Sequence, residues 1–193
     1  MTSMANLFSS SSVTVAVVLI FFSLPGCTST ETTISDTLPY EAQQRINTSE
    51  EFNVDFTFKG HPDAETITAS FGGAKSSYSI NGPFKGKLEQ LFRAKFGEIS
   101  EDSENKVKVQ VSDINPKSET GPPIHRLSMS VDVTVMHEGK ENSRNFSFRT
   151  TVRPKDETDM TISYRIPPEP IEDYLMQYVV GIDSFLDSTL GIQ

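Results

Sequence analysis

The sequence predicts an α+β fold, a two-layer sandwich in which a mostly antiparallel sheet is covered on one face by two helices. Several segments alternate apolar and polar residues with period two, which is typical of half-buried strands. Two other segments carry a single apolar stripe at helical spacing. Because strands and helices of this kind bury their apolar surfaces most economically against each other, we expect the polar face of the sheet to remain in water.

The first strand is predicted over residues 52–58, where Phe52, Val54, Phe56 and Phe58 share one face. The other strongly alternating segments are 107–111, 127–135 and 146–152, and weaker candidates are 65–71, 77–80 and 160–166. The sequence His137-Glu138-Gly139-Lys140 lies between the last two strong segments, and Gly139 can adopt positive φ. These two segments are therefore predicted to form a long hairpin.

Two helices are predicted, over 83–99 and from 171 to about 190. Asn81 is a candidate N-cap for the first helix, and Pro83 suits its first turn. Gly181 lies inside the second helix and is expected to weaken it. The apolar stripe of the first helix consists of Phe84, Leu88, Leu91, Phe92, Phe96 and Ile99.

Residues 1–26 are predicted to be a signal peptide. Their apolar run, VTVAVVLIFF at 13–22, is far shorter than the roughly 20 residues that a spanning helix needs. The run leads to Leu24-Pro25-Gly26-Cys27, which contains the only cysteine of the chain. A single cysteine cannot form an internal disulfide, so the fold must depend on packing.

The sequence Leu24-Pro25-Gly26-Cys27 resembles the bacterial lipobox. This resemblance implies that the Cys27 thiol receives a diacylglycerol, that cleavage precedes Cys27, and that the new amino terminus is acylated. Thr28 replaces the Asp that signals inner-membrane retention in enteric-type bacteria, so the resemblance implies the periplasmic leaflet of the outer membrane. Two alternatives stay open: a conventional signal peptide with an incidental cysteine, and an uncleaved anchor.

Residues 27–50 are predicted to form the lipidated cysteine and a flexible tether, followed by one α+β domain over 51–193. The tether is rich in Thr, Ser, Glu and Gln and has few large apolar side chains to offset the entropy of ordering. As a flexible coil it would span roughly 25 Å.

The net charge of −9 argues against nucleic acid as a partner, because phosphate binding requires clustered cations. His61, His125 and His137 are scattered without metal-ligand spacing, and the sequence has no recognisable nucleophile motif. We therefore expect no catalytic residues, no metal and no cofactor.

The polar face of the predicted sheet carries Lys106, Lys108, Arg149 and Arg153. Two interpretations are open for these cations. They are ordinary solvent-facing residues that discourage edge-to-edge strand pairing, or they form one docking patch for an acidic partner or a lipid phosphate.

The size and the order of elements over residues 52–190 resemble those of periplasmic accessory lipoproteins of lipid-transport and lipopolysaccharide-assembly systems. This resemblance implies a non-enzymatic accessory or scaffold subunit of a cell-envelope complex, anchored through Cys27 and bound to a protein partner. The main alternative is a lipoprotein that holds an apolar or lipid ligand between sheet and helices. A hydrolase with a dispersed site and a surface-displayed structural protein are further alternatives.

Overall fold

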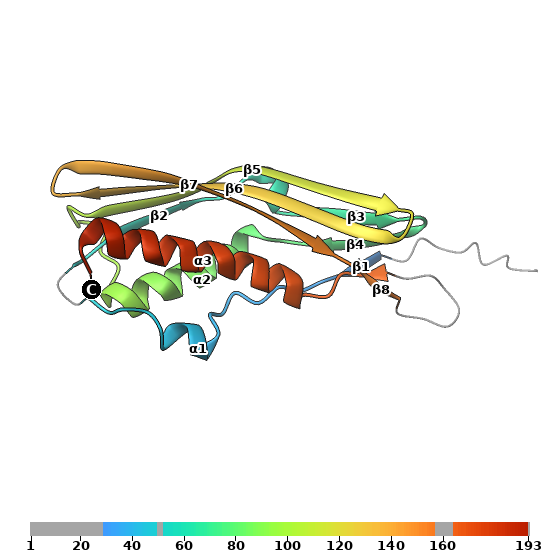
Figure 1. Cartoon of the computed structure of the whole chain (residues 1–193), viewed down its shortest axis with the longest axis horizontal. Coiled ribbons are helices and arrows are strands. Elements are labelled where there is room, and N and C mark those ends of the chain that lie inside the picture. Colours follow the sequence, from blue (N-terminus) through green and yellow to red (C-terminus); the bar gives the residue numbers. More distant parts are fainter. Residues whose placement is uncertain (1–28, 50–51, 157–163, 193) are drawn as a thin grey trace, which may run out of the picture.

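The computed structural model describes residues 29–49, 52–156 and 164–192. The predicted signal peptide, Cys27 and residues 160–163 of the last predicted strand lie outside this part of the chain. Figure 1 shows two layers, with long strands above and helices α2 and α3 below. The predicted fold class is confirmed, with one difference: the sheets are mixed, because two of the strand pairs are parallel.

The larger sheet has four strands in the order β2-β5-β6-β7. β2 pairs in parallel with β5, whereas β5, β6 and β7 are successive antiparallel strands. Glu138 and Gly139 both have positive φ, 50° and 71°, as a tight turn between β6 and β7 requires. The predicted long hairpin is therefore present. The four strands are β2 (Asp55–Lys59), β5 (Lys106–Thr120), β6 (Pro123–His137) and β7 (Lys140–Val152).

β5 extends well beyond the predicted segment 107–111. The prediction stops there because a bulge after Val111 interrupts the alternation of apolar and polar residues. The register with β6 shifts between Val111 and Asp113. Val107, Val109 and Val111 are buried before the bulge, and Ile114 is the first buried residue after it. The extra residue moves the buried face from odd to even positions, so the alternation that identified residues 107–111 could not predict the rest of the strand.

A smaller, three-stranded sheet continues the strand layer, in the order β1-β4-β3. It contains β1 (Ser29–Glu31), β3 (Ile67–Phe71) and β4 (Ala74–Tyr78). The 3-10 helix η1 (Pro62–Ala64) precedes β3, and the two-residue strands β8 (Lys155–Asp156) and β9 (Tyr164–Arg165) pair with each other. The Ser70 N–H of β3 donates to Ser118 Oγ of β5 at 3.3 Å, which joins the two sheets side by side.

The helices are α1 (Tyr40–Gln43), α2 (Asn81–Phe96) and α3 (Glu169–Leu190). Phe84 of α2 and Tyr174 and Tyr178 of α3 are fully buried and fill the space under the sheet. Tyr178 Oη donates to the Met129 carbonyl at 2.5 Å and accepts from the Phe148 N–H at 3.0 Å. The phenol thus bonds α3 directly to β6 and β7.

Gly181 has a packing role in α3. A Cβ at this position would lie 2.9 Å from Cε1 of Phe146, which is closer than real Cβ contacts. The glycine therefore lets the helix approach β7, which offsets the weakening predicted from its helix propensity.

The prediction that Asn81 caps α2 is wrong. Ile80 occupies the N-cap position, and Asn81 is the first helical residue. Its side-chain amide instead donates to the His61 carbonyl at 2.8 Å and to Glu65 Oε1 at 2.7 Å. The side chain therefore ties the start of α2 to the segment before β3.

The predicted flexible tether is also wrong where the structure describes it. Residues 29–49, here called the arm, contain β1 and α1 and lie against the folded body. Thr32, Ile34 and Leu38 are buried, with exposed fractions of 2%, 6% and 1%. The arm is therefore part of the domain, and the domain boundary at residue 51 does not hold.

Candidate functional site

The arm runs along α2 on the side that faces away from the sheet (Figure 1). Many of its contacts are hydrogen bonds between its backbone and side chains of α2 and α3. The Leu38 N–H donates to Gln90 Oε1 at 3.0 Å, and Gln90 Nε2 donates to the Asp36 carbonyl at 3.0 Å. The Ser35 N–H donates to Glu172 Oε1 of α3 at 2.8 Å. These bonds fix the path of the arm, and the buried side chains of Ile34 and Leu38 add apolar contact with the core.

Lys87 of α2 is a buried cation that holds the middle of the arm. Its side chain is 1% exposed, and Nζ donates to the Thr37 carbonyl at 2.7 Å. Burial lowers the pKa of Lys87, and the negative charges of Glu172 and Asp36 oppose this shift. The arm carbonyl therefore supplies a hydrogen bond that a buried ammonium requires.

Lys95, two turns further along α2, holds the end of the arm. Its Nζ lies 2.8 Å from Asp183 Oδ1 and 2.5 Å from Asp187 Oδ1, both on α3. The same amine donates to the Asn47 carbonyl of the arm at 3.2 Å. One buried lysine thus joins α2, α3 and the arm.

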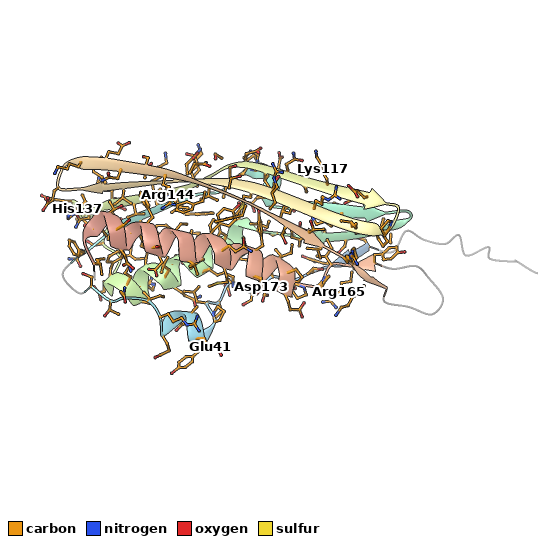
Figure 2. The ribbon with its side chains drawn as sticks, viewed as in Figure 1. Glu41, Lys117, His137, Arg144, Arg165 and Asp173 are labelled. Atoms are coloured by element: carbon orange, nitrogen blue, oxygen red, sulfur yellow. The ribbon has the colours of Figure 1, made fainter. Side chains whose placement is uncertain are left out.

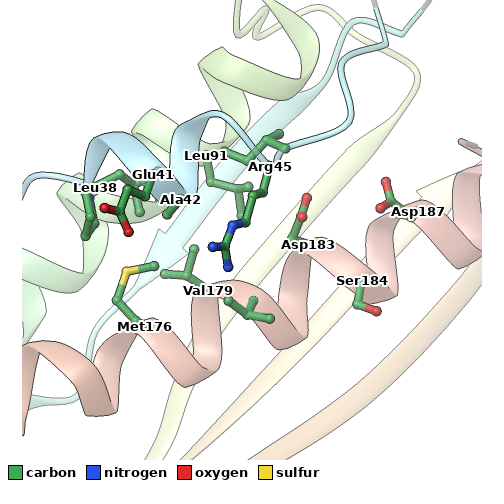
Figure 3. A pocket seen from close by; sticks show the side chains of 13 residues that line it. Leu38, Glu41, Ala42, Arg45, Leu91, Met176, Val179, Asp183, Ser184 and Asp187 are labelled. Atoms are coloured by element: carbon green, nitrogen blue, oxygen red, sulfur yellow. The ribbon is translucent and has the colours of Figure 1, made fainter.

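These contacts create a groove of about 490 Å³ between α1 and α3 (Figure 3). Leu38, Leu91, Met176 and Val179 give it an apolar floor, and the Arg45 side chain points into it from the turn after α1. Further lining comes from Pro39, Glu41, Ala42, Ile46, Val180, Asp183, Ser184 and Asp187. Since the lining is apolar with charged groups at its margins, the groove is suited to an amphipathic segment or a small apolar molecule.

Two large apolar side chains near the groove are exposed to solvent. Val180 on α3 is 61% exposed and lines the groove, and Tyr40 at the start of α1 is 73% exposed. Exposed apolar surface of this kind, framed by polar residues, often marks an interaction site. The groove is therefore the candidate functional site of the domain.

The structure does not bring the predicted cations into one patch. Lys108 pairs with Thr134, whereas Arg149 pairs with Ser128, six residues along β6, or roughly 20 Å away. Lys106 and Lys108 therefore lie near one end of the sheet, and Arg149 lies toward the other, with Arg153 directly after β7. A role for any of these cations in partner binding stays a prediction.

Arg149 has basic neighbours that the sequence analysis missed. It lines an open cleft of about 500 Å³ on the outer face of the sheet, together with Lys117 of β5 and Arg126 of β6. Strand register alone brings these side chains together, because 23 residues separate Arg126 from Arg149 in the sequence.

His125 is fully buried and joins the two sheets. Its Nε2 lies 2.5 Å from Tyr78 Oη of β4, and Nδ1 lies 3.4 Å from Ser118 Oγ of β5. Burial lowers the pKa of His125 to about 4 and raises that of Tyr78 well above its ordinary value. Both ring nitrogens already have protein partners, so the imidazole acts as a structural crosslink.

The residues that hold the arm did carry a signal in the sequence. Lys87 and Lys95 lie on the same helical face as Phe84, Leu88 and Leu91, at spacings of three and four residues. A lysine inside an apolar stripe needs a buried hydrogen-bond partner, so these two positions indicate that another segment of the chain covers this face of the helix.

Comparisons with known proteins give no family. No protein-family model matches the chain, and no curated protein matches it by sequence. A crystal structure of an uncharacterized protein is 8% identical over 84% of this chain and 99% of the other, with a TM-score of 0.43. A hypothetical protein from Chlamydia trachomatis is 7% identical over 70% and 97%, with a TM-score of 0.44.

A minor lipoprotein from Acinetobacter baumannii is 10% identical over 71% of this chain and 93% of its own, with a TM-score of 0.37. All three TM-scores are below 0.5, so these likenesses carry no argument about function. Within the described residues, no helix is both long and apolar enough to span a bilayer.

Proposed function

We propose that this protein is a membrane-anchored bacterial lipoprotein that acts as a non-enzymatic accessory subunit of a cell-envelope complex, and that the groove between α1 and α3 is its docking surface. The observation that supports docking is the apolar groove with the exposed Val180 at its margin. The occupant that fits best is an amphipathic segment of a protein partner, with its apolar side chains on the groove floor.

The membrane anchor is proposed from the sequence Leu24-Pro25-Gly26-Cys27 and its apolar lead-in. Each buried methylene adds about 0.8 kcal/mol to membrane affinity, so the two or three chains of a lipoprotein hold a protein on the bilayer. Thr28 after Cys27 favours the periplasmic leaflet of the outer membrane. Mass spectrometry of the mature protein should find an acylated Cys27 at its amino terminus, and Cys27→Ser should abolish that species.

The docking surface is tested by crosslinking in cells. A photoreactive residue at Val180 should capture one stoichiometric envelope partner, identified after purification through the C-terminus. The same residue at Asp173, also exposed on α3 but outside the groove lining, is the matched control. Capture from Asp173 equal to that from Val180 would contradict docking at the groove.

A second candidate function, binding of a small apolar or lipid ligand, is supported by the volume of the groove. About 490 Å³ lies in the ordinary range for ligand pockets. The space between sheet and helices, which the sequence suggests as the place for such a ligand, is filled by Phe84, Tyr174 and Tyr178. Native mass spectrometry of purified protein would reveal a co-purified ligand, and a bulky Val179→Trp variant should displace it.

A further inference from the structure

We propose that the cleft formed by Lys117, Arg126 and Arg149, here called the basic cleft, binds the phosphates of anionic phospholipids in the leaflet that holds the anchor. The end of the domain that carries β1 then lies against the bilayer. This inference rests on the proposed acylation of Cys27 and adds an orientation to it.

The basic cleft is built by three adjacent strands. Lys117 of β5 pairs with Arg126 of β6, and Arg126 pairs with Thr151 of β7. The next row towards the other end of the sheet consists of Asn115, Ser128 and Arg149. Cations, hydroxyls and an amide on one face are the donors that a phosphate accepts from.

Two of the three cations are available for such a ligand. Arg126 forms an ion pair with Glu119 on the same face. Among the described residues, neither Lys117 nor Arg149 forms an ion pair with an acidic side chain. Both are exposed, so the cleft presents net positive charge on a chain whose overall charge is −9.

The basic cleft lies in the same cross-strand row as the start of β1. Ser29 is paired with Lys75, Lys75 is paired with Ser70, and the Ser70 N–H donates to Ser118 Oγ. Ser118 follows Lys117 in β5. Because neighbouring strands are about 4.8 Å apart, Ser29 lies roughly 15 Å from β5, with the exposed Lys75 between them.

The link from this row to the anchor is short. Cys27 precedes Ser29 by two residues, and two residues of chain span at most about 7 Å. The arm that follows is fixed, since the Thr32 N–H donates to the Ser77 carbonyl and Thr32 Oγ1 donates to the Ile166 carbonyl, both at 2.8 Å. An acylated Cys27 therefore holds the row of the basic cleft near the headgroups.

The charge distribution favours the same orientation. Figure 2 shows Lys117 and Arg165 in the half of the molecule that contains β1, and His137 at the far end. That far end carries exposed carboxylates on Glu98, Glu101, Asp102, Glu104, Glu138 and Glu141, which outnumber its exposed cations on Lys106, Lys108, Lys140 and Arg144. An anionic bilayer attracts the cleft and repels the far end.

The test uses the acylated, full mature protein in vesicles that contain phosphatidylglycerol. Since Cys27 is the only cysteine, an introduced cysteine is the only free thiol for a fluorophore. Gly121→Cys labels the β5–β6 turn, where a Cβ meets no atom within 4 Å, and Lys140→Cys labels the first residue of β7, directly after the β6–β7 turn. β6, with 15 residues, separates the two turns by roughly 50 Å.

We expect a headgroup-attached quencher to quench the label at position 121 and not the label at 140. Replacing Lys117, Arg126 and Arg149 with Gln should reduce the ratio of domains that lie against the bilayer to domains released from it by about 100-fold, since each of the three cations near an anionic surface contributes about fivefold. Raising NaCl from about 0.1 M to about 1 M should act similarly, because the Debye length falls from about 10 Å to about 3 Å.

The control replaces Lys59, Lys106 and Lys108 with Gln, which removes the same charge from the far part of the outer face and should leave the quenching unchanged. If the cleft variant and its parent are quenched equally, the proposed orientation is wrong. It is also wrong if phosphatidylcholine vesicles quench the label as strongly as phosphatidylglycerol vesicles do. Neither result affects the proposed anchor. A mature protein without acyl mass on Cys27 overturns the proposed anchor, and the orientation with it.

Discussion

The core and the arm of this domain differ in the balance of apolar packing and hydrogen bonding that holds them. Under the sheet, α2 and α3 pack through aromatic and aliphatic side chains such as Phe84 of α2 and Tyr174 and Tyr178 of α3, which are fully buried. The arm buries few large side chains, and its backbone is held by Lys87, Gln90 and Lys95. Both regions have a defined structure, but only the core can be recognised in the sequence, from the spacing of its apolar residues.

Because of this difference, we expect the core to unfold as one cooperative unit and the arm to detach by itself. Apolar contacts in the core are shared among many neighbours, so the loss of one large side chain affects the whole domain. The arm depends on a few directional bonds, each to one side chain, so the loss of one should free a short segment and leave the sheet folded. Four changes test whether the two regions respond in these different ways.

Phe84→Ala should give the largest effect. Phe84 is fully buried, and its ring contacts Phe58 and Tyr178 edge-on at centroid distances of 5.9 and 5.8 Å. Truncation leaves a cavity in the packed interior and should cost about 3–5 kcal/mol of unfolding free energy. Denaturant unfolding measures this loss, and the partly buried Phe52 provides a milder comparison. A loss below about 1 kcal/mol would show that the core is not closely packed.

Acid should weaken the core through His125. The folded-state pKa is about 4, below the ordinary 6.5 of an unfolded histidine. As the pH falls from about 6.5 to about 4, the unfolded chain binds a proton that the folded protein excludes, so stability decreases across this window. The loss is at most about 3 kcal/mol. It is measured as the difference in pH dependence between the parent and His125→Phe, because carboxylates titrate equally in both. If the unfolding free energies of the parent and His125→Phe change equally with pH, His125 does not have a lowered pKa in the folded protein.

The strands at 107–111, 127–135 and 146–152 were predictable because one face of each meets the core and the other meets water. The arm was not, because its own composition is typical of a disordered segment. Its partners Lys87 and Lys95 are 50 and 48 residues away from the carbonyls that they bind. The basic cleft could not be predicted from the sequence either, because its residues are brought together by the register of β5, β6 and β7 and by the bulge after Val111.

Lys95→Met should affect the arm more than the core. Asp183 and Asp187 would lose the cation that they share. Their side chains are 21% and 22% exposed, so water can replace only part of the lost interaction. We expect a loss of about 2 kcal/mol. Hydrogen exchange should become faster around Asn47 while β6 stays protected.

Lys85→Met is the matched control on the same helix. Lys85 and Glu89 form an exposed i,i+4 pair at 3.5 Å, so the change should be below about 0.5 kcal/mol. If both variants lose the same stability, or if Lys95→Met exposes β6 and the arm together, the arm is not an independently held segment.

Gly86→Ala should have the smallest effect on global stability and the most local one. A Cβ at Gly86 would lie 2.7 Å from Asp36 Cβ and 3.0 Å from the Asp36 carbonyl oxygen, whereas a Cβ at Gly82 would meet nothing within 4 Å. Both glycines lie in α2, so alanine raises helix propensity at each, by at most about 1 kcal/mol. The difference between the two variants therefore isolates the contact with the arm. Gly82→Ala should be neutral or stabilising, and Gly86→Ala should speed hydrogen exchange at residues 34–38. If Gly86→Ala leaves exchange in that segment unchanged, the arm does not lie against α2, and the groove between α1 and α3 is lost with it.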